Sequence, residues 1–218
     1  MDLLYAQEHK NFDGDCGIIE TQLVEKSKKG DIMDTLDAIR KRCSLKAHIS
    51  KREIEPEKIN IILEAGRVAP SARNYQPWRL IVIQDRKVIE RLVKAFSESN
   101  QVIIDAPVIL VVCARAGDDV IKNDMEYYLF DVGLAVENMV LAATELGLIT
   151  HLMTAFDESV VKQILHIPED VRAVVATPLA YPLEASYDEA ARERLSIRTR
   201  KDMKELVHSN HWTEAEPA

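Results

Sequence analysis

Apolar residues recur every three or four positions over several stretches of the chain, a pattern typical of helices with one buried face. The first such stretch, residues 31–42, begins at Asp31, a residue type that caps helices. The second, residues 53–69, must end by Ala69, because the residue before a proline avoids the α region. The pattern groups Ile32, Leu36 and Ile39 on one face of the first helix, and Ile59, Ile62, Leu63 and Gly66 on the inward face of the second.

Further along, short apolar runs rich in β-branched residues alternate with amphipathic stretches. The short runs predict buried strands at residues 79–84, 107–114 and 171–182. The amphipathic stretches predict helices at residues 88–96, 125–146 and 157–170, with a last helical turn or two after Asp202. Strands and helices around one core indicate the α+β or α/β class and a single compact domain.

The remaining stretches carry no clear period. Residues 1–30 contain three glycines, and we interpret them as an N-terminal extension that precedes a domain at residues 31–218. The polar residues 115–124 predict a loop, and more polar chain follows residue 182.

Composition narrows the class of protein. A chain of 218 residues with 47% hydrophobic residues can bury a substantial core, and its formal net charge of -8 disfavours nucleic acid or an anionic membrane as a partner. Cys16, Cys43 and Cys113 have no C-x-x-C spacing, which suits a reducing compartment and thiols without a structural metal. With no signal-peptide pattern and no apolar run of membrane-spanning length, the sequence predicts a soluble cytoplasmic protein.

Several common enzyme motifs are absent from the sequence. It contains seven glycines but no G-x-G, so a Rossmann fingerprint and a phosphate-binding P-loop are both excluded. It contains no HExxH and no GxSxG, and its six histidines never fall at i, i+4 spacing. A zinc hydrolase or a serine hydrolase therefore has no support, and no metal site is predicted.

Two basic segments stand out against the acidic background. In RKRCSLK (40–46), Arg42, Ser44 and Lys46 alternate, so in an extended chain they project to one side and can receive a phosphate dianion. The alternative is a basic helix end that interacts with the helix dipole. In RLSIRTRK (194–201), Arg198 and Arg200 alternate in the same way and form either a second anion clamp or a solvated charge run.

A third segment, PSARNYQPW (70–78), lies between a predicted helix and a predicted strand. Pro70 fixes the chain as it leaves the helix, and Ser71, Asn74 and Gln76 then offer donors and acceptors on a stiffened loop. Such a loop can bind the edge of a flat heterocycle. The alternative is a turn whose Ser and Asn satisfy their own backbone. Trp78 either covers a ligand or joins the core.

Taken in order, RKRCSLK, PSARNYQPW, LAVENMVLAATELGL, IPED…AYP and R-T-R before a final helix resemble the FMN-dependent nitroreductase family. The resemblance covers roughly residues 32–212, and the pairing of R-x-S-x-K with PS-x-x-N-x-QPW is its specific part. It implies an α+β fold, with a mixed sheet flanked by helices. It also implies a homodimer with two FMN sites at the subunit interface.

The resemblance assigns roles to individual residues. Arg42, Cys43, Ser44 and Lys46 would hold the phosphate and ribityl side and the pyrimidine edge of the flavin, and Arg198 and Arg200 would close on the phosphate. Pro70, Ser71 and Asn74 would contact the same flavin from the partner subunit. Thr154 and Ala155 replace the Glu-Gly pair that the family often has near flavin N5, where a backbone N–H can still serve. Other departures are Cys43, where arginine or histidine is frequent, and Ala180, where glycine is common.

The implied activity is transfer of electrons from NAD(P)H, a transient co-substrate, through FMN to a nitroaromatic, quinone or similar small acceptor. No side chain is then an essential acid or base. The alternatives are a reductive dehalogenase, a flavin-modifying enzyme, a non-catalytic flavin-binding regulatory protein, and an α/β module with no flavin. Tyr127 and Tyr128 either shape a pocket for aromatic substrates or pack at the start of a helix.

Overall fold

The computed structural model describes residues 35–197 and 199–213. The predicted N-terminal extension, the cap Asp31, Ile32 and Arg198 lie outside the described residues. The predicted division of the chain at residue 31 therefore remains a prediction.

The centre of the fold is an antiparallel sheet with the order β1-β2-β5. Its strands are β1 (Trp78–Ile83), β2 (Val108–Ala114) and β5 (Arg172–Leu179), so the three predicted strands are confirmed. Isolated bridges extend the sheet beyond β5, from Ala176 to Met153 and from Ala180 to Ile149, and a parallel bridge then joins Thr150 to Ser44. The sheet with its bridges is therefore mixed, as expected.

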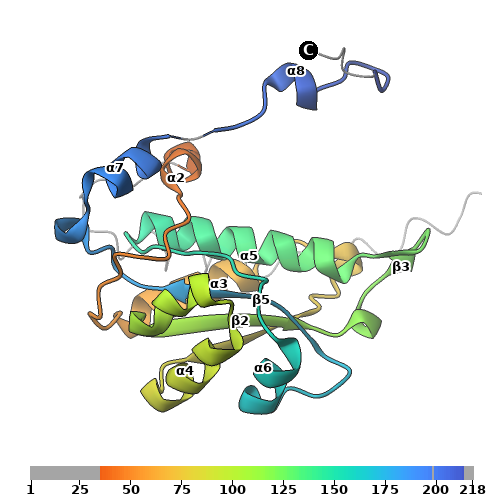
Figure 1. Ribbon diagram of the computed structural model, residues 1–218. Coiled ribbons are helices and arrows are strands. Elements are labelled where there is room, and N and C mark those ends of the chain that lie inside the picture. Colours follow the sequence, from red (N-terminus) through yellow and green to blue (C-terminus); the bar gives the residue numbers. More distant parts are fainter. Residues whose placement is uncertain (1–34, 198, 214–218) are drawn as a thin grey trace, which may run out of the picture.

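Helices cover both faces of the sheet (Figure 1). The helices α3 (Pro56–Arg67) and α5 (Tyr128–Glu145) lie over one face, and α4 (Arg86–Leu92) and α6 (Glu158–Leu165) lie over the other. Side chains of β2 alternate between the two cores: Val108, Leu110 and Val112 pack with α3 and α5, whereas Ile109, Val111 and Cys113 pack with α4 and α6. Burial raises the pKa of the Cys113 thiol to about 11, so this cysteine is an inert core residue.

Helix ends follow the predicted signals in some places and depart from them in others. The Asp157 carboxylate accepts hydrogen bonds from the first turn of α6, and Asp202 caps α8 (Met203–Leu206) in a capping box. The helical turn predicted after Asp202 is therefore confirmed. However, the helix predicted over residues 157–170 ends at Leu165, and His166 then adopts the left-handed region. The first helix, α2, spans Thr35–Lys41.

The structure contains several helices and strands that the sequence patterns did not predict. The long helix was predicted from residue 125 but begins at Tyr128, because β3 (Ile121–Lys122) and β4 (Met125–Glu126) form a short hairpin before it. Polar chain after residue 182 contains α7 (Glu189–Ser196), whose sequence EAARERLS has too few apolar positions to signal a buried face. The structure also contains single-turn or short 3₁₀ segments at Ala72–Asn74, Val93–Ala95, Glu98–Asp105, Ala116–Asp118 and Glu184–Ser186.

Two segments expose apolar side chains that the described chain does not cover. On α2, Leu36 and Ile39 are 54% and 49% exposed, although the sequence groups them on one face. After α7 the chain leaves the body of the domain and carries α8 away from it (Figure 1). This C-terminal segment exposes Ile197, Met203, Leu206, Val207 and Trp212.

The contact between α3 and α5 depends on a glycine. Gly66 is buried on the inward face of α3, as predicted, and a Cβ at this position would lie 2.8 Å from both Cγ and Sδ of Met139 on α5. Met139 is itself buried and has little room to move. The glycine therefore allows the two helices to approach closely.

We expect Gly66→Ala to lower the free energy of unfolding by about 1–2 kcal/mol, because overpacking outweighs the better helix propensity of alanine. The matched control is Gly133→Ala on α5, where an added Cβ meets nothing within 4 Å. This control should raise stability by up to about 1 kcal/mol. Chemical denaturation measures both changes, and equal stability of the two variants would contradict the close approach.

Candidate functional site

The basic segment at residues 42–46 lies beside the segment that follows α5. Ser44 forms a parallel bridge with Thr150, and the Leu45 N–H donates to the Thr150 carbonyl at 3.1 Å. Leu45 is buried in the core, so its neighbours turn the other way: Ser44 is exposed, and Arg42 and Lys46 are half-buried. Burial therefore alternates from Ser44 to Lys46, whereas Arg42 and Cys43 are both half-buried.

The donors of this segment are largely unused within the chain. Lys46 Nζ donates to the buried Asn100 Oδ1 at 3.4 Å. By contrast, the Arg42 guanidinium and the Ser44 hydroxyl have no hydrogen-bond partner among the described residues. Cys43, half-buried between them, is a free thiol. A half-buried arginine without an acceptor fits an anionic ligand.

A histidine next to this segment is also left without a partner. His151 Nδ1 is buried and forms no hydrogen bond in the described part of the chain. Burial, and then the charge of Lys46, lowers the pKa of His151, so the ring is neutral at physiological pH. No local pattern marks His151 as a site residue, because it becomes a neighbour of Lys46 only through the pairing of Ser44 with Thr150.

The residues predicted to lie near flavin N5 are exposed on the same segment. The Ala155 carbonyl accepts from the Ser97 N–H at 3.1 Å, which fixes the turn. The backbone N–H groups of Thr154 and Ala155 have no acceptor among residues 35–197 and 199–213. Two free N–H groups therefore lie on the segment whose Thr150 pairs with Ser44.

The loop at residues 70–77 is held mainly by its own polar groups. The Ser71 hydroxyl accepts from the Gln76 N–H at 3.0 Å, and Gln76 Nε2 donates to the Asn74 carbonyl at 3.0 Å. Arg73, Asn74 and Gln76 all have positive φ. Ser71 and Gln76 thus act as turn residues, whereas Pro70 and the Asn74 amide are exposed. Trp78 joins the core.

A buried acid that sequence reasoning missed fixes this loop from outside. Asp131 on α5 is 1% exposed, and its Oδ2 accepts from the Ala72 N–H at 2.7 Å. Burial raises the pKa of Asp131, and Asp119, whose Oδ2 is buried without a partner, raises it further. The available signal was a carboxylate in the first turn of a mainly apolar helix.

Among the described residues, no hydrogen bond or ion pair joins the loop at residues 70–77 to residues 42–46. The Ala72 N–H donates to Asp131, which lies in the first turn of α5. By contrast, Ser44 pairs with Thr150, which follows the end of α5. Arg200 on the C-terminal segment donates to its own neighbour, the Thr199 carbonyl, and no described contact joins it to Arg42.

The family model of the nitroreductases, described as "Nitroreductase family", matches residues 39–105 and 98–181 of this chain. The chain belongs to the nitroreductase family. The match includes the 42–46 segment, the 70–77 loop and the 154–155 turn, so the resemblance seen in the sequence is confirmed.

Individual relatives agree with this family. The chain is 32% identical over 156 residues to a protein of Methanothermobacter thermautotrophicus that is provisionally named NADH dehydrogenase/NAD(P)H nitroreductase, covering 70% of this chain and 79% of that one. It is 28% identical over 157 residues to an iodotyrosine deiodinase of Thermotoga neapolitana, covering 61% and 81%. A solved structure, "the oxidoreductase containing FMN", has the same fold with a TM-score of 0.71 and 23% identity, covering 87% of this chain and 96% of that one.

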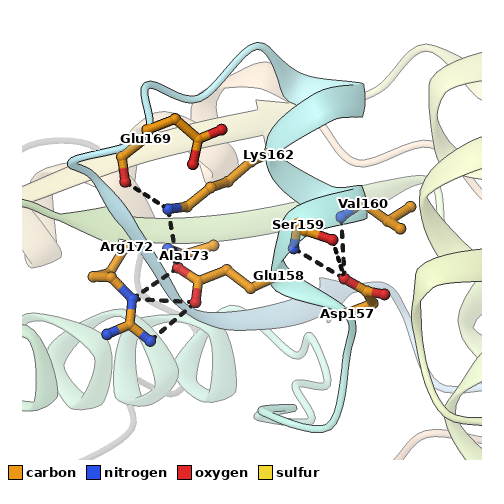
Figure 2. A network of polar contacts seen from close by, with 8 residues as sticks. All are labelled: Asp157, Glu158, Ser159, Val160, Lys162, Glu169, Arg172 and Ala173. Carbon is orange, nitrogen blue, oxygen red and sulfur yellow. Dashed lines mark hydrogen bonds and ion pairs between the residues drawn. The ribbon is translucent and has the colours of Figure 1, made fainter.

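In this nitroreductase-family chain, a cavity of about 210 Å³ opens beside Thr154. Its walls come from the first turn of α5, the start of β5 and the start of α6, and they include Tyr128 and Arg172. Figure 2 shows the polar network along one wall: Glu158 lies between Arg172 and Lys162 and accepts from both Arg172 Nε and the Ala173 N–H. The Arg172 guanidinium lowers the pKa of Glu158, which is therefore ionised.

Among the described residues, no cluster of three or more His, Cys, Asp or Glu side chains could hold a metal ion. None of the described helices is long and apolar enough to cross a bilayer.

We expect Asp131→Ala to lower the free energy of unfolding by about 1–3 kcal/mol, because it leaves the Ala72 N–H without its acceptor. Asp131→Asn keeps an acceptor oxygen and is the matched control. Since burial raises the pKa of Asp131 in the folded state, the wild type should lose stability relative to Asp131→Asn as pH rises from the ordinary carboxylate range to the raised pKa. Urea denaturation at several pH values measures both effects, and a pH-independent difference would contradict the buried acid.

Proposed function

We propose that this member of the nitroreductase family is an FMN-dependent oxidoreductase that takes electrons from NAD(P)H and passes them to a small acceptor, such as a nitroaromatic or a quinone. One observation carries the proposal. The pairing of Ser44 with Thr150 joins the segment that carries the unpartnered Arg42 and the half-buried Lys46 to the segment that carries the free N–H groups of Thr154 and Ala155.

These residues suit the two ends of FMN. Its phosphate carries nearly two negative charges, and Arg42 with the Ser44 hydroxyl offers charge-assisted hydrogen bonds to it. Arg198 and Arg200 would add to this phosphate site, and Cys43 would lie against the ribityl chain. Lys46 would place its positive charge at the pyrimidine edge, where it stabilises negative charge on the ring.

When bound, FMN supplies the redox chemistry between NAD(P)H and the acceptor. The chain's own contribution is to bind and orient. The N–H groups of Thr154 and Ala155 would donate a hydrogen bond at N5 in place of a side chain. No side chain is proposed as an essential acid or base.

We also propose a homodimer in which each FMN site is shared, with Pro70, Ser71 and Asn74 contributed by the partner subunit. Pro70 and the Asn74 amide are exposed and make no hydrogen bond to residues 42–46 among the described residues, so they are available to a partner's site. The exposed Leu36 and Ile39 on α2 and the apolar C-terminal segment offer surface for a second copy. The free thiols Cys43 and Cys113 support a cytoplasmic location.

The direct test is flavin reduction. We expect the purified protein to bind FMN with the absorbance bands of an oxidised flavin, and we expect NADH or NADPH to bleach them under anaerobic conditions. Protein that binds no FMN would refute the assignment, and FMN binding without bleaching would indicate a non-catalytic flavin protein. The deiodinase relative makes reductive dehalogenation a second candidate, which iodide release from iodotyrosine by the pre-reduced enzyme distinguishes from nitro reduction.

Two variants test the shared site. Arg42→Ala should weaken FMN binding by about 1.5–3 kcal/mol, because a charge-assisted contact to the phosphate is lost. Asn74→Ala should weaken it by about 0.5–1.5 kcal/mol, since a neutral hydrogen bond is lost. Equilibrium titration of the apoprotein with FMN measures both changes. The activity of each variant is then assayed at an FMN concentration too low to fill its sites.

Co-refolding equal amounts of the two variants should restore activity. In a dimer with shared sites, a mixed dimer has one site with both lesions and one site with neither. Random pairing makes half of the dimers mixed, so about a quarter of wild-type activity should return. If each site lay within one chain, every site would keep one lesion. No recovery, with mixed dimers confirmed by native mass spectrometry, would refute the shared site.

A further inference from the structure

A second cavity, of about 250 Å³, lies where α6 ends, on the side of the sheet that α4 and α6 cover. Its floor includes Ile81 of β1 and Cys113 of β2, which both pack with the core on this side. Because α6 ends at Leu165, this end of the two strands is left to the chain that leads on to β5. That chain supplies the remaining apolar walls, which are Leu165, Ile167, Pro168 and Val171.

This cavity lies away from the proposed flavin site. None of its described lining residues belongs to residues 42–46, the 70–77 loop or the 154–155 turn. The turn precedes the first residue of α6, whereas the cavity lies at the other end of that helix. Pockets for drug-sized ligands span roughly 300–1,000 Å³, so the volume of this cavity suits a single ring or a short branched chain.

The polar side chains of the cavity are arranged around one shared carboxylate. Asp118 Oδ2 accepts from Arg79 Nη2 at 3.4 Å and lies 3.6 Å from Arg115 Nη1. Arg115 Nε also donates to Asp170 Oδ2 at 2.6 Å. Arg79 Nη1 donates to the Trp78 carbonyl at 2.9 Å. These contacts hold two guanidinium groups at the cavity.

Each of the two arginines keeps a donor that the chain does not use. Arg79 Nε and Arg115 Nη2 have no acceptor among the residues that the structure describes. The His166 ring, which also lines the cavity, has no hydrogen-bond partner in that part of the chain. Hydrogen bonds from a guanidinium to a carboxylate are charge-assisted, so a carboxylate is a suitable acceptor for these N–H groups.

The charges at the cavity favour an anion. Arg79 and Arg115 share the one carboxylate of Asp118, whose side chain is 29% exposed. Asp170 holds Arg115 from outside the lining and is 64% exposed, so solvent screens its charge more strongly. The cavity therefore favours a negatively charged group at the arginines, and its apolar floor and walls favour a hydrocarbon body.

We propose that this cavity binds a small monocarboxylate with an apolar body, such as an aromatic or branched-chain acid. The hydrocarbon part would lie against Ile81 and Cys113, and the carboxylate would accept from Arg79 Nε and Arg115 Nη2. The site goes beyond the proposed oxidoreductase activity, because none of its residues has a role in binding the flavin.

The test compares benzoate with benzamide, which has the same ring and nearly the same shape but no charge. Each is titrated into FMN-saturated protein without NAD(P)H, with the isoleucine and valine methyl groups labelled with ¹³C. We expect the methyl signals of Ile81, Ile167 and Val171 to shift and saturate with benzoate, and benzamide to bind about 5–10-fold more weakly. These signals report binding at the cavity itself, so a carboxylate bound elsewhere is recognised.

Variants of the two arginines test the recognition of the carboxylate. Arg115→Gln should weaken benzoate binding about 5–10-fold and leave benzamide binding unchanged, because only a charge-assisted contact is lost. Arg79→Gln tests the other guanidinium in the same way. The matched control is Arg67→Gln, which removes an exposed arginine paired with Glu64 on α3 and should change neither affinity.

Unmoved methyl signals would show that the cavity takes no ligand of this kind. Equal affinity for the two probes, or unchanged benzoate binding in both arginine variants, would overturn the role of the arginines. Inorganic phosphate that shifts the same signals at the same concentration would overturn the selection for an apolar body. Failure to bind FMN would refute the proposed flavin enzyme but not this site, since the titration can be made on protein without FMN.

Discussion

The burial of β2 on both faces is the constraint on which the fold depends. Every residue of this strand is buried, so the sheet needs a layer of helices on each side. The α3–α5 pair on one side must come close to the sheet and to each other, and Gly66 against Met139 makes this possible. On the other side α4 and α6 complete the second core. Both faces of the sheet are therefore covered by helices, and a binding site can form only at its edges or past the end of a helix.

The edge at β5 is where the candidate site forms. Strand edges carry unpaired backbone groups that must be covered, and the segment after α5 covers β5 through Ile149 and Met153. The same segment pairs on its outer side with Ser44. Protection of the edge and assembly of the basic site are therefore one arrangement. The chain between Met153 and α6 turns away from the sheet, which leaves the Thr154 and Ala155 N–H groups free and makes room for the cavity beside them.

Local patterns in the sequence were sufficient for the strands and for most helices, because β2 is apolar over its whole length, α5 is mainly apolar, and Asp157 and Asp202 are effective caps. They failed for α7, which has no apolar stripe. The alternation of Arg42, Ser44 and Lys46 was also visible locally. In contrast, Asp131, His151 and the Tyr128 cavity depend on neighbours far away in the sequence. The burial of an acid and the missing partner of an imidazole nitrogen can be recognised only once the surrounding chain is in place.

The tether between Asp131 and Ala72 has a consequence for assembly. Association normally costs conformational entropy when loops become ordered at the interface. Here the hydrogen bonds from the Ala72 N–H to Asp131 and from the Gln76 N–H to Ser71 lie entirely within one subunit. The loop thus has its shape before a second chain arrives. A subunit that offers this loop to a partner would offer a preformed surface. The entropy cost of ordering the loop would then not oppose dimer formation.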